Sequence, residues 1–252
     1  MQCGLNLYSI RSLFKDKETL LSTCLKAKEM GYKYLQFSGM KLNADDLKEV
    51  TEKTGLPFVL THVPMDDILN RTKELVDEHK LFGCTNIGLG MMPIDILKDE
   101  QRFHETASAL NAAGEKMSKL GAKLFYHFHQ FEFSKHRGIR ILDYIIDNCP
   151  YINFTADTYW IQNGGGDIED YMLKMAGRMD CIHLKDYQIV FEDNKFVPKY
   201  APIGVGNLNF KKIMKTAEKC GVKYYLVEQD DAVNYPDPLE QVKISVDEIA
   251  KW

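Results

Sequence analysis

The sequence of 252 residues lacks the features that mark several large classes of protein. It contains no run of about 18 apolar residues, which excludes a transmembrane helix. No block of lysine and arginine interrupts the balance of 32 basic and 36 acidic residues, so nothing indicates an electrostatic surface for nucleic acid. The opening MQCGLNLYSIRSLF has no charged segment ahead of its apolar residues and is typical of a strand rather than a signal peptide.

Cysteine is sparse, and no CxxC pair occurs. The wide spacing predicts reduced thiols in a cytoplasmic protein rather than a disulfide framework or a zinc knuckle. No linker, low-complexity tract or shift in composition divides the chain, which predicts one domain over residues 1–252. The six cysteines are Cys3, Cys24, Cys84, Cys149, Cys181 and Cys220.

Two hydrophobic periods alternate along the chain. Short β-branched or aromatic runs recur about every 32 residues, close to the roughly 30 residues of a βα unit, and longer segments of helical spacing separate them. Eight such units predict an α/β fold, a (β/α)8 TIM barrel. A doubly wound open sheet is the alternative, but no GxGxxG follows the first strand. The expected strands begin near residues 3, 34, 58, 86, 123, 152, 181 and 224.

Glycines mark where the helices should end before the next strand. One long interruption, from Tyr187 to Phe210, is too polar and too rich in glycine and proline for a helix, and we expect a long loop there. Glycines 204 and 206 within it could cradle a phosphate, although a GxG pattern alone is weak evidence. The expected helix-ending glycines are Gly31, Gly55, Gly83, Gly121 and Gly221.

The C-terminal ends of the expected strands carry many groups that bind metals, and a TIM barrel builds its active site there. Taken singly, such a histidine fits a structural role, Asp157 fits a helix cap and Glu228 fits a solvated loop. Taken together, an acid, an acid, a histidine and an acid at the ends of strands five to eight favour a metal site, because buried charges need partners. The strand-end residues are His62, His127, His129, Glu132, Asp157, His183, Lys185, Asp186, Glu228, Gln229 and Asp230.

Three carboxylates and one imidazole form the ligand set that this pattern predicts. They are Glu132, Asp157, His183 and Glu228. Oxygen-rich sets favour hard to borderline ions, so we expect one divalent cation, Mn²⁺ or Mg²⁺, with Zn²⁺ or Co²⁺ left open.

The same strand ends carry a family resemblance, which touches seven of the eight strands. It resembles the sugar phosphate isomerase/epimerase branch of the xylose-isomerase-like barrels. The opening GLNLYSIRS and the segment YLQFSG are similar to that branch as well. The other matching strings are YHFHQFEF (126–133), FTADTYW (154–160), IHLKDY (182–187), PIGVGNLNF (202–210) and YYLVEQD (224–230).

The resemblance implies roles for individual residues. It implies the four metal ligands just named, and it gives Glu132 and Glu228 a second role in moving the proton of the substrate. Two departures stand out. The loop has Gly204-Val205-Gly206 where the family commonly has GEG, and some relatives place the fifth-strand carboxylate where His127 stands. The residues implied to contact substrate are Gln36, His62, His129 and Lys185.

The predicted function is a metal-dependent sugar isomerase or epimerase acting beside the carbonyl of a keto-sugar or polyol-derived ketone. A divalent cation stabilises the charge of the enediolate, and a carboxylate takes the proton. Loss of a β-hydroxyl or an aglycone from the same intermediate would instead make the protein a lyase, of the inositol-dehydratase or 3-keto-glycoside-cleaving type. An abasic-site nuclease and a silent sugar-binding barrel are weaker alternatives. The expected partner is a small sugar, not a membrane or nucleic acid, and a homo-oligomer stays open.

Overall fold

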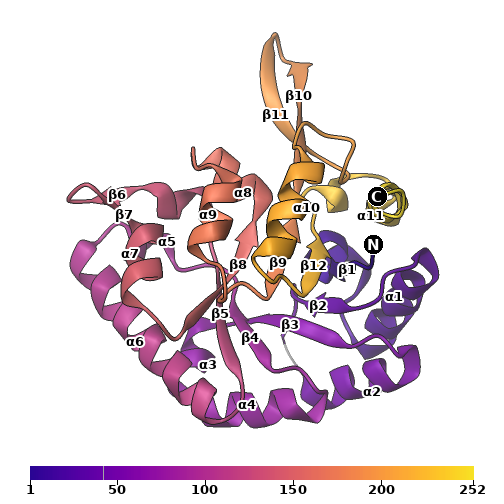
Figure 1. The fold of residues 1–252 in the computed structure, drawn as a ribbon. Coiled ribbons are helices and arrows are strands. Elements are labelled where there is room, and N and C mark those ends of the chain that lie inside the picture. The colour runs from indigo at the N-terminus through magenta and orange to yellow at the C-terminus, as the bar shows by residue number, and fades with distance from the viewer. Residues whose placement is uncertain (42) are drawn as a thin grey trace.

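Eight parallel strands close into a barrel in the computed structural model, which describes residues 1–41 and 43–252 (Figure 1). The order around the barrel is β1-β12-β9-β8-β5-β4-β3-β2. This confirms the predicted TIM barrel. Each strand begins within one residue of its expected position. The barrel strands are β1 (Gly4–Asn6), β2 (Leu35–Phe37), β3 (Phe58–Val63), β4 (Asn86–Leu89), β5 (Lys123–His127), β8 (Ile152–Asp157), β9 (Cys181–Leu184) and β12 (Tyr224–Val227).

Helices connect the strands and surround them on the outside (Figure 1). Three short 3₁₀ helices, η1 (Leu7–Leu13), η2 (Gln130–Phe133) and η3 (Ala232–Asn234), follow strands β1, β5 and β12 at the mouth of the barrel. The α-helices are α1 (Lys17–Met30), α2 (Ala44–Thr54), α3 (Met65–Asn70), α4 (Thr72–Leu81), α5 (Ile94–Leu97), α6 (Glu100–Lys119), α7 (Ile141–Asn148), α8 (Thr158–Asn163), α9 (Ile168–Lys174), α10 (Phe210–Lys219) and α11 (Pro238–Ile249).

Local sequence signals set where the helices begin and end. The Asp16 side chain accepts a bond from the Thr19 N–H, and the Thr19 side chain returns one, so α1 starts with a capping box. Gly31 then ends α1 with a φ of 107°, a conformation that costs glycine little because it has no Cβ. All five glycines expected to end helices have positive φ.

Two hydrophobic clusters stabilise the fold. The larger one packs the helices against the outside of the strands. The smaller one includes Leu60 from β3, Phe125 from β5, Cys181 from β9 and Leu226 from β12. Because these strands lie on different sides of the barrel, side chains that contact one another from all of them fill its interior. The barrel is therefore a packed core rather than a pore.

The long interruption after β9 forms an antiparallel hairpin rather than the expected loop. Its strands are β10 (Asp186–Glu192) and β11 (Lys195–Ala201), and it projects from the barrel in Figure 1. Asp193 and Asn194 both take positive φ, 51° and 60°, which is the geometry of a two-residue hairpin turn. The remaining residues alternate along extended strands, a period that was obscured because the hairpin was taken together with the glycine-containing segment that follows it. A second short hairpin joins β6 (Lys135–His136) to β7 (Ile139–Arg140).

The pairing register of neighbouring strands brings their C-terminal ends to the same mouth of the barrel. Asp157 lies beside His183, and His127 lies beside Thr155, in parallel pairs. Since all eight strands run the same way, their C-terminal side chains meet around one opening.

Within residues 1–41 and 43–252, no helix is long and apolar enough to cross a membrane. All six cysteines are free and buried, in agreement with the expectation of unpaired thiols.

Candidate metal centre

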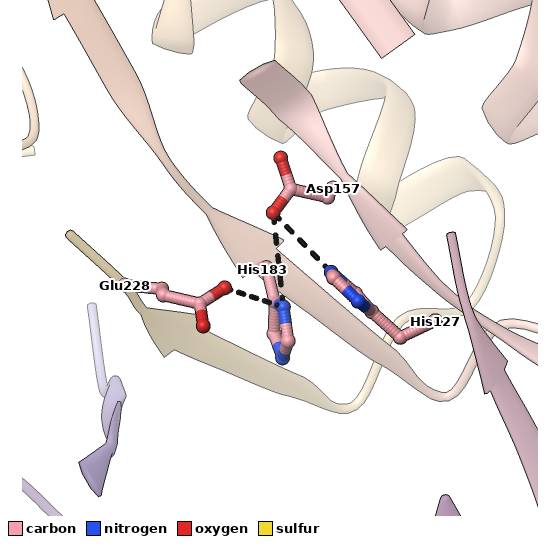
Figure 2. Close-up of side chains that lie close together, drawn as sticks. All are labelled: His127, Asp157, His183 and Glu228. Atoms are coloured by element: carbon pink, nitrogen blue, oxygen red, sulfur yellow. Dashed lines mark hydrogen bonds and ion pairs between the residues drawn. The ribbon is translucent and has the colours of Figure 1, made fainter. Parts of the chain in front are cut away.

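Four side chains converge at the C-terminal mouth of the barrel (Figure 2). His127 ends β5, Asp157 ends β8 and His183 lies on β9. Glu228 follows directly after β12. One ligand atom from each lies within 4.8 Å of the others, and all four residues are buried. Three of the four residues predicted from the sequence are therefore brought together, and His127 takes the fourth position.

The closest contacts in this cluster join atoms that would normally bind a cation. Nδ1 of His183 lies 2.8 Å from Oε2 of Glu228 and 3.8 Å from Oδ2 of Asp157. Nε2 of His127 lies 3.5 Å from the same Oδ2 (Figure 2). Neither Nδ1 of His183 nor Oε2 of Glu228 has a partner with hydrogen-bond geometry among the described residues. Buried polar atoms without partners are rare, and here they face one common point.

The protein holds the outer oxygen of each carboxylate and leaves the inner one facing the cluster. Asn6 donates from its side-chain amide to Oε1 of Glu228 at 2.7 Å. The Trp160 backbone N–H donates to Oδ1 of Asp157 at 2.9 Å, because Asp157 also caps α8. The structure thus combines the two readings of Asp157, helix cap and cluster member, in one side chain.

Each histidine is oriented through the ring nitrogen that points away from the cluster. Nε2 of His183 donates to Oε1 of Gln36 at 2.7 Å, and Nδ1 of His127 donates to the carbonyl oxygen of Gly90 at 2.9 Å. We assign the tautomers from these acceptors, which can receive a hydrogen but not give one. A bound metal ion would meet a lone pair on each ring at the nitrogen that faces the cluster, as with other metal-binding histidines. Without a metal ion, burial acts against the charge of His183, but Glu228 and Asp157 outweigh it and raise the pKa of His183 to about 9.

This donor set fits a divalent metal ion. Two imidazole nitrogens and two carboxylate oxygens match borderline divalent cations. Burial disfavours the charged form of Asp157 and Glu228, but nearby cationic groups outweigh burial and hold the pKa of both carboxyls below the ordinary range. Both are therefore ionised, the state that metal binding requires.

Lys185 is the buried cation next to the cluster. Its Nζ lies 3.1 Å from Oδ2 of Asp157, 3.1 Å from Oε2 of Glu228 and 3.0 Å from Oδ2 of Asp230, and its side chain is 1% exposed. The ammonium also lies 5.0 Å from the centre of the Trp160 ring. Burial acts against its charge, but attraction to the three carboxylates prevails and raises the pKa of Lys185 well above its usual value.

A cavity of about 1240 Å³ opens onto this cluster. Polar side chains from the strand ends line it together with apolar side chains such as Met40, Met65 and Leu89. A concave site with a few convergent polar groups is the usual form of a small-molecule site. The polar residues at the strand ends that line it include Ser38, His62, His127, His129, Lys185, Glu228 and Asp230.

Comparison with known proteins identifies the family. The profile of the family described as xylose isomerase-like TIM barrel matches residues 24–251. The chain belongs to this family. No curated protein is similar enough to the chain to count as a match.

Solved structures similar to this xylose isomerase-like barrel share its fold at low sequence identity. A sugar phosphate isomerase/epimerase from Parabacteroides distasonis ATCC 8503 is 24% identical with a TM-score of 0.83, over 100% of this chain and 98% of that chain. The 3-keto-D-glucoside 4-epimerase from E. coli is 14% identical with a TM-score of 0.70, over 100% of both chains. A family protein from Mycobacterium smegmatis in complex with magnesium is 12% identical with a TM-score of 0.73, over 99% of this chain and 94% of that chain.

Glu132, which was predicted as a ligand and a catalytic acid–base group, lies outside the cluster of this xylose isomerase-like barrel. Its carboxylate accepts bonds from the Tyr126 hydroxyl at 2.7 Å and the His129 N–H at 2.9 Å. These bonds are local, because Glu132 sits in η2 and closes a capping box there. Burial raises the pKa of Glu132 to about 7, although both hydrogen bonds lower it.

The residues predicted to contact substrate divide into two groups. His62, His129 and Lys185 line the cavity. Gln36 is fully buried and is not among the described residues that line it. Instead its amide nitrogen lies 3.1 Å from Oγ of Ser38 and 3.2 Å from Nε2 of His62, while its oxygen holds His183. Burial and neighbouring cationic groups lower the pKa of His129 to about 3, so its ring is neutral.

In the Gly204–Gly206 turn, the N–H groups of Gly204 and Gly206 are bonded to a side chain of the protein itself, so they do not form a site for a phosphate. The N–H groups of Gly204 and Gly206 donate to Oδ2 of Asp186 at 3.1 and 3.0 Å. A Cβ on Gly206 would lie 2.4 Å from that carboxylate and from the Tyr187 carbonyl oxygen, so this position requires glycine. The turn fastens the base of the β10–β11 hairpin to the barrel rather than forming a phosphate cradle.

Proposed function

We propose that this xylose isomerase-like barrel is a divalent-metal-dependent sugar isomerase or epimerase. Its reaction would move a proton beside the carbonyl of a keto-sugar or polyol-derived ketone. The observation that carries the proposal is the convergence of two histidines, two ionised carboxylates and Lys185 at one end of a large cavity. The similar folds from P. distasonis and E. coli, described as an isomerase/epimerase and an epimerase of sugars, support it.

His127, Asp157, His183 and Glu228 would hold the metal ion. This set revises the sequence-based set at one position, with His127 in place of Glu132. A second imidazole shifts the preference away from Mg²⁺ toward Mn²⁺, Zn²⁺ or Co²⁺, and we propose Mn²⁺ first because two carboxylates remain. When bound, the cation stabilises the negative charge that develops on the carbonyl oxygen during proton removal.

Glu228 is the residue we assign to proton transfer. It is ionised, it lines the cavity, and Asn6 fixes its outer oxygen at 2.7 Å. A carboxylate held in this way can take a proton from one carbon and return it to the neighbouring carbon, which exchanges a ketose for an aldose. Lys185, which also lines the cavity, would donate a hydrogen bond from its ammonium to a substrate oxygen.

Epimerisation needs a second group on the opposite face of the substrate. Glu132 was predicted for that role, but it is not among the described residues that line the cavity. Its carboxylate instead fixes the backbone of His129, whose ring does line the cavity and whose Nδ1 has no hydrogen-bond partner among the described residues. We therefore assign Glu132 to positioning His129, and His129 to contact with the substrate.

Proton exchange in deuterated water tests this function. The protein is purified without chelator, loaded with Mn²⁺ and incubated with a panel of keto-sugars, keto-inositols and 3-keto-glycosides, while NMR follows both deuterium uptake and product. The proposed reaction gives deuterium at the carbon next to the carbonyl together with an isomeric sugar. Release of water or an aglycone would instead establish a lyase, the alternative that shares the first proton transfer.

Two controls make the result specific. Glu192 lies on the exposed hairpin, so Glu192→Gln should exchange deuterium at the wild-type rate. Protein stripped of metal and kept in chelator should not exchange. Product formation without any deuterium uptake, or full activity in chelator, would contradict the proposal.

A further inference from the structure

Lys185 occupies an unusual place between two groups of carboxylates. It contacts Oδ2 of Asp157 and Oε2 of Glu228, which are the same oxygens that face His183 in Figure 2. Its third contact, with Asp230, lies outside the metal-ligand cluster. The ammonium of Lys185 and a metal ion would therefore compete for these two oxygens. The carboxylate of Asp230 contacts Lys185 but does not belong to the metal-ligand cluster.

Charge balance separates the two states of the site. Asp157, Glu228 and Asp230 carry three negative charges, and Lys185 supplies one positive charge beside that of His183, whose Nδ1 lies 2.8 Å from Oε2 of Glu228. A divalent cation adds two positive charges and brings the sum to zero if the histidines bind it as neutral rings. Buried charges need compensation of this kind, since their desolvation is large. The carboxylate of Asp230 is therefore needed for charge balance only if Lys185 stays nearby after a divalent cation has entered the site.

The positions of the acidic side chains also separate Asp230 from the metal-ligand cluster. Asp230 and Lys185 both line the cavity, and the Asp230 side chain is 24% exposed, whereas that of Asp157 is fully buried. The main-chain oxygen of Asp230 accepts a bond from Arg11 at 3.2 Å, which holds the start of this loop in place. The aromatic rings of Trp160 and Tyr200 lie 5.0 and 5.9 Å from the ammonium and favour a cation at this position.

We propose that Lys185 is a counter-ion of the metal-free site, and that Asp230 is a positioning residue that keeps the ammonium at the cavity when a divalent cation takes Asp157 and Glu228. The inference rests on the proposed metal site. Lys185 competes with the metal for two oxygens, and Asp230 relieves that competition. When the metal ion takes those two oxygens, the remaining contact with Asp230 also directs the ammonium of Lys185 toward the substrate. Removing Lys185 and removing the charge of Asp230 must then change metal affinity in opposite directions.

Metal titration of chelator-treated protein tests the inference without any substrate. Calorimetry measures the Kd for Mn²⁺ of the wild type, Lys185→Met, Asp230→Asn and the double variant at one pH. We expect the Kd to fall about tenfold in Lys185→Met and to rise about tenfold in Asp230→Asn, within the range of ordinary coupling between sites. In the Lys185→Met background, the effect of Asp230→Asn should shrink to about twofold.

A thermal measurement provides a second readout. Loss of Lys185 leaves three carboxylates without their cation, so Mn²⁺ should raise the Tm of Lys185→Met by more than it raises that of the wild type. Lys185→Gln, which keeps a hydrogen-bond donor, replaces Lys185→Met if the latter does not fold. Lys199→Met on the exposed hairpin is the matched control and should change neither quantity.

The outcomes separate this inference from the proposed function. If wild-type protein binds neither Mn²⁺ nor Zn²⁺, the metal site itself is wrong and the inference falls with it. If the wild type binds metal but both single variants weaken binding, Lys185 and Asp230 are only structural, and the inference alone is overturned. An equal effect of Asp230→Asn with and without Lys185 would overturn it as well.

Discussion

Nε2 of His127 lies 3.5 Å from Oδ2 of Asp157, and this contact closes the candidate metal site on the side of strand β5. The neighbouring acid, Glu132, has both oxygens engaged by Tyr126 and His129. An imidazole from β5 therefore faces the acid that ends β8. The two histidines and two carboxylates make the site richer in nitrogen than the sequence pattern indicated.

Metal content distinguishes His127 from Glu132 as the ligand. We expect His127→Ala to lose most of its bound metal, because a ligand is removed, and Glu132→Gln to keep it, because its carboxylate lies outside the cluster. Elemental analysis of protein purified without chelator measures this, with circular dichroism confirming that each variant folds. If Glu132→Gln purified without metal and His127→Ala retained it, Glu132 rather than His127 would be the fourth ligand.

Substitution of Glu228 tests the proton transfer. Glu228→Gln keeps the size and one oxygen but loses the basicity, so turnover should fall by at least about 10²-fold. Deuterium exchange into the substrate should fall in parallel, since the same carboxylate removes the proton. Glu192→Gln on the hairpin is the matched control. Wild-type turnover by a metal-loaded Glu228→Gln variant would rule out the assignment.

Gln36 should act on the metal through His183. Gln36→Met fills the same space but removes the acceptor for Nε2 of His183, so metal affinity should fall by about 10–100-fold, as is typical when a group that orients a ligand is lost. Gln36→Glu keeps an acceptor and should restore most of the affinity. Calorimetric titration with Mn²⁺ compares the two. A direct contact with the substrate would instead change KM and leave the metal Kd unchanged.

His79 makes stability depend on pH at a place away from the site. It is fully buried on α4, its Nδ1 lies 2.7 Å from the Leu75 carbonyl oxygen and its Nε2 lies 2.8 Å from the Thr61 hydroxyl. Burial lowers the pKa of His79 from 6.5 to about 4, despite its bond to Leu75. The unfolded chain therefore binds this proton at a higher pH than the folded chain, and stability is lost as pH falls from 6.5 toward 4.

The expected loss from His79 is about 2 kcal/mol at about pH 5. Urea unfolding of wild type and His79→Gln at about pH 8 and about pH 5 measures it. The variant should lose less stability than the wild type over this interval, whatever its stability at the higher pH. Equal losses in both proteins would show that His79 does not titrate in this way.

The sequence by itself determined the fold of this protein. Alternating hydrophobic periods and capping signals are local properties, and strands expected near residues 123 and 152 begin at those positions. The hairpin of Asp186–Ala201 was the exception, because its many polar residues and the glycine-rich segment that follows it resembled a loop. Its turn depends on two adjacent residues, Asp193 and Asn194, that adopt positive φ.

The sequence also indicated most of the strand ends that form the candidate metal cluster. Asp157, His183 and Glu228 could be named because parallel strands deliver their C-terminal residues to one opening. A stricter use of the strand period would have found His127 too. Phe125 packs in the barrel interior, and the residue two positions later on a strand points to the same side.

Only the tertiary structure decided which atoms meet. Gln36 holds His183 across 147 positions of the sequence, and Asn6 holds Glu228 across 222. Likewise, Lys185 reaches Asp230 from a different strand end. A sequence pattern places a residue on a strand and a face, but hydrogen bonds depend on distances and angles that arise when the barrel closes. Those distances place Glu132 beside His129 and leave His127 facing Asp157.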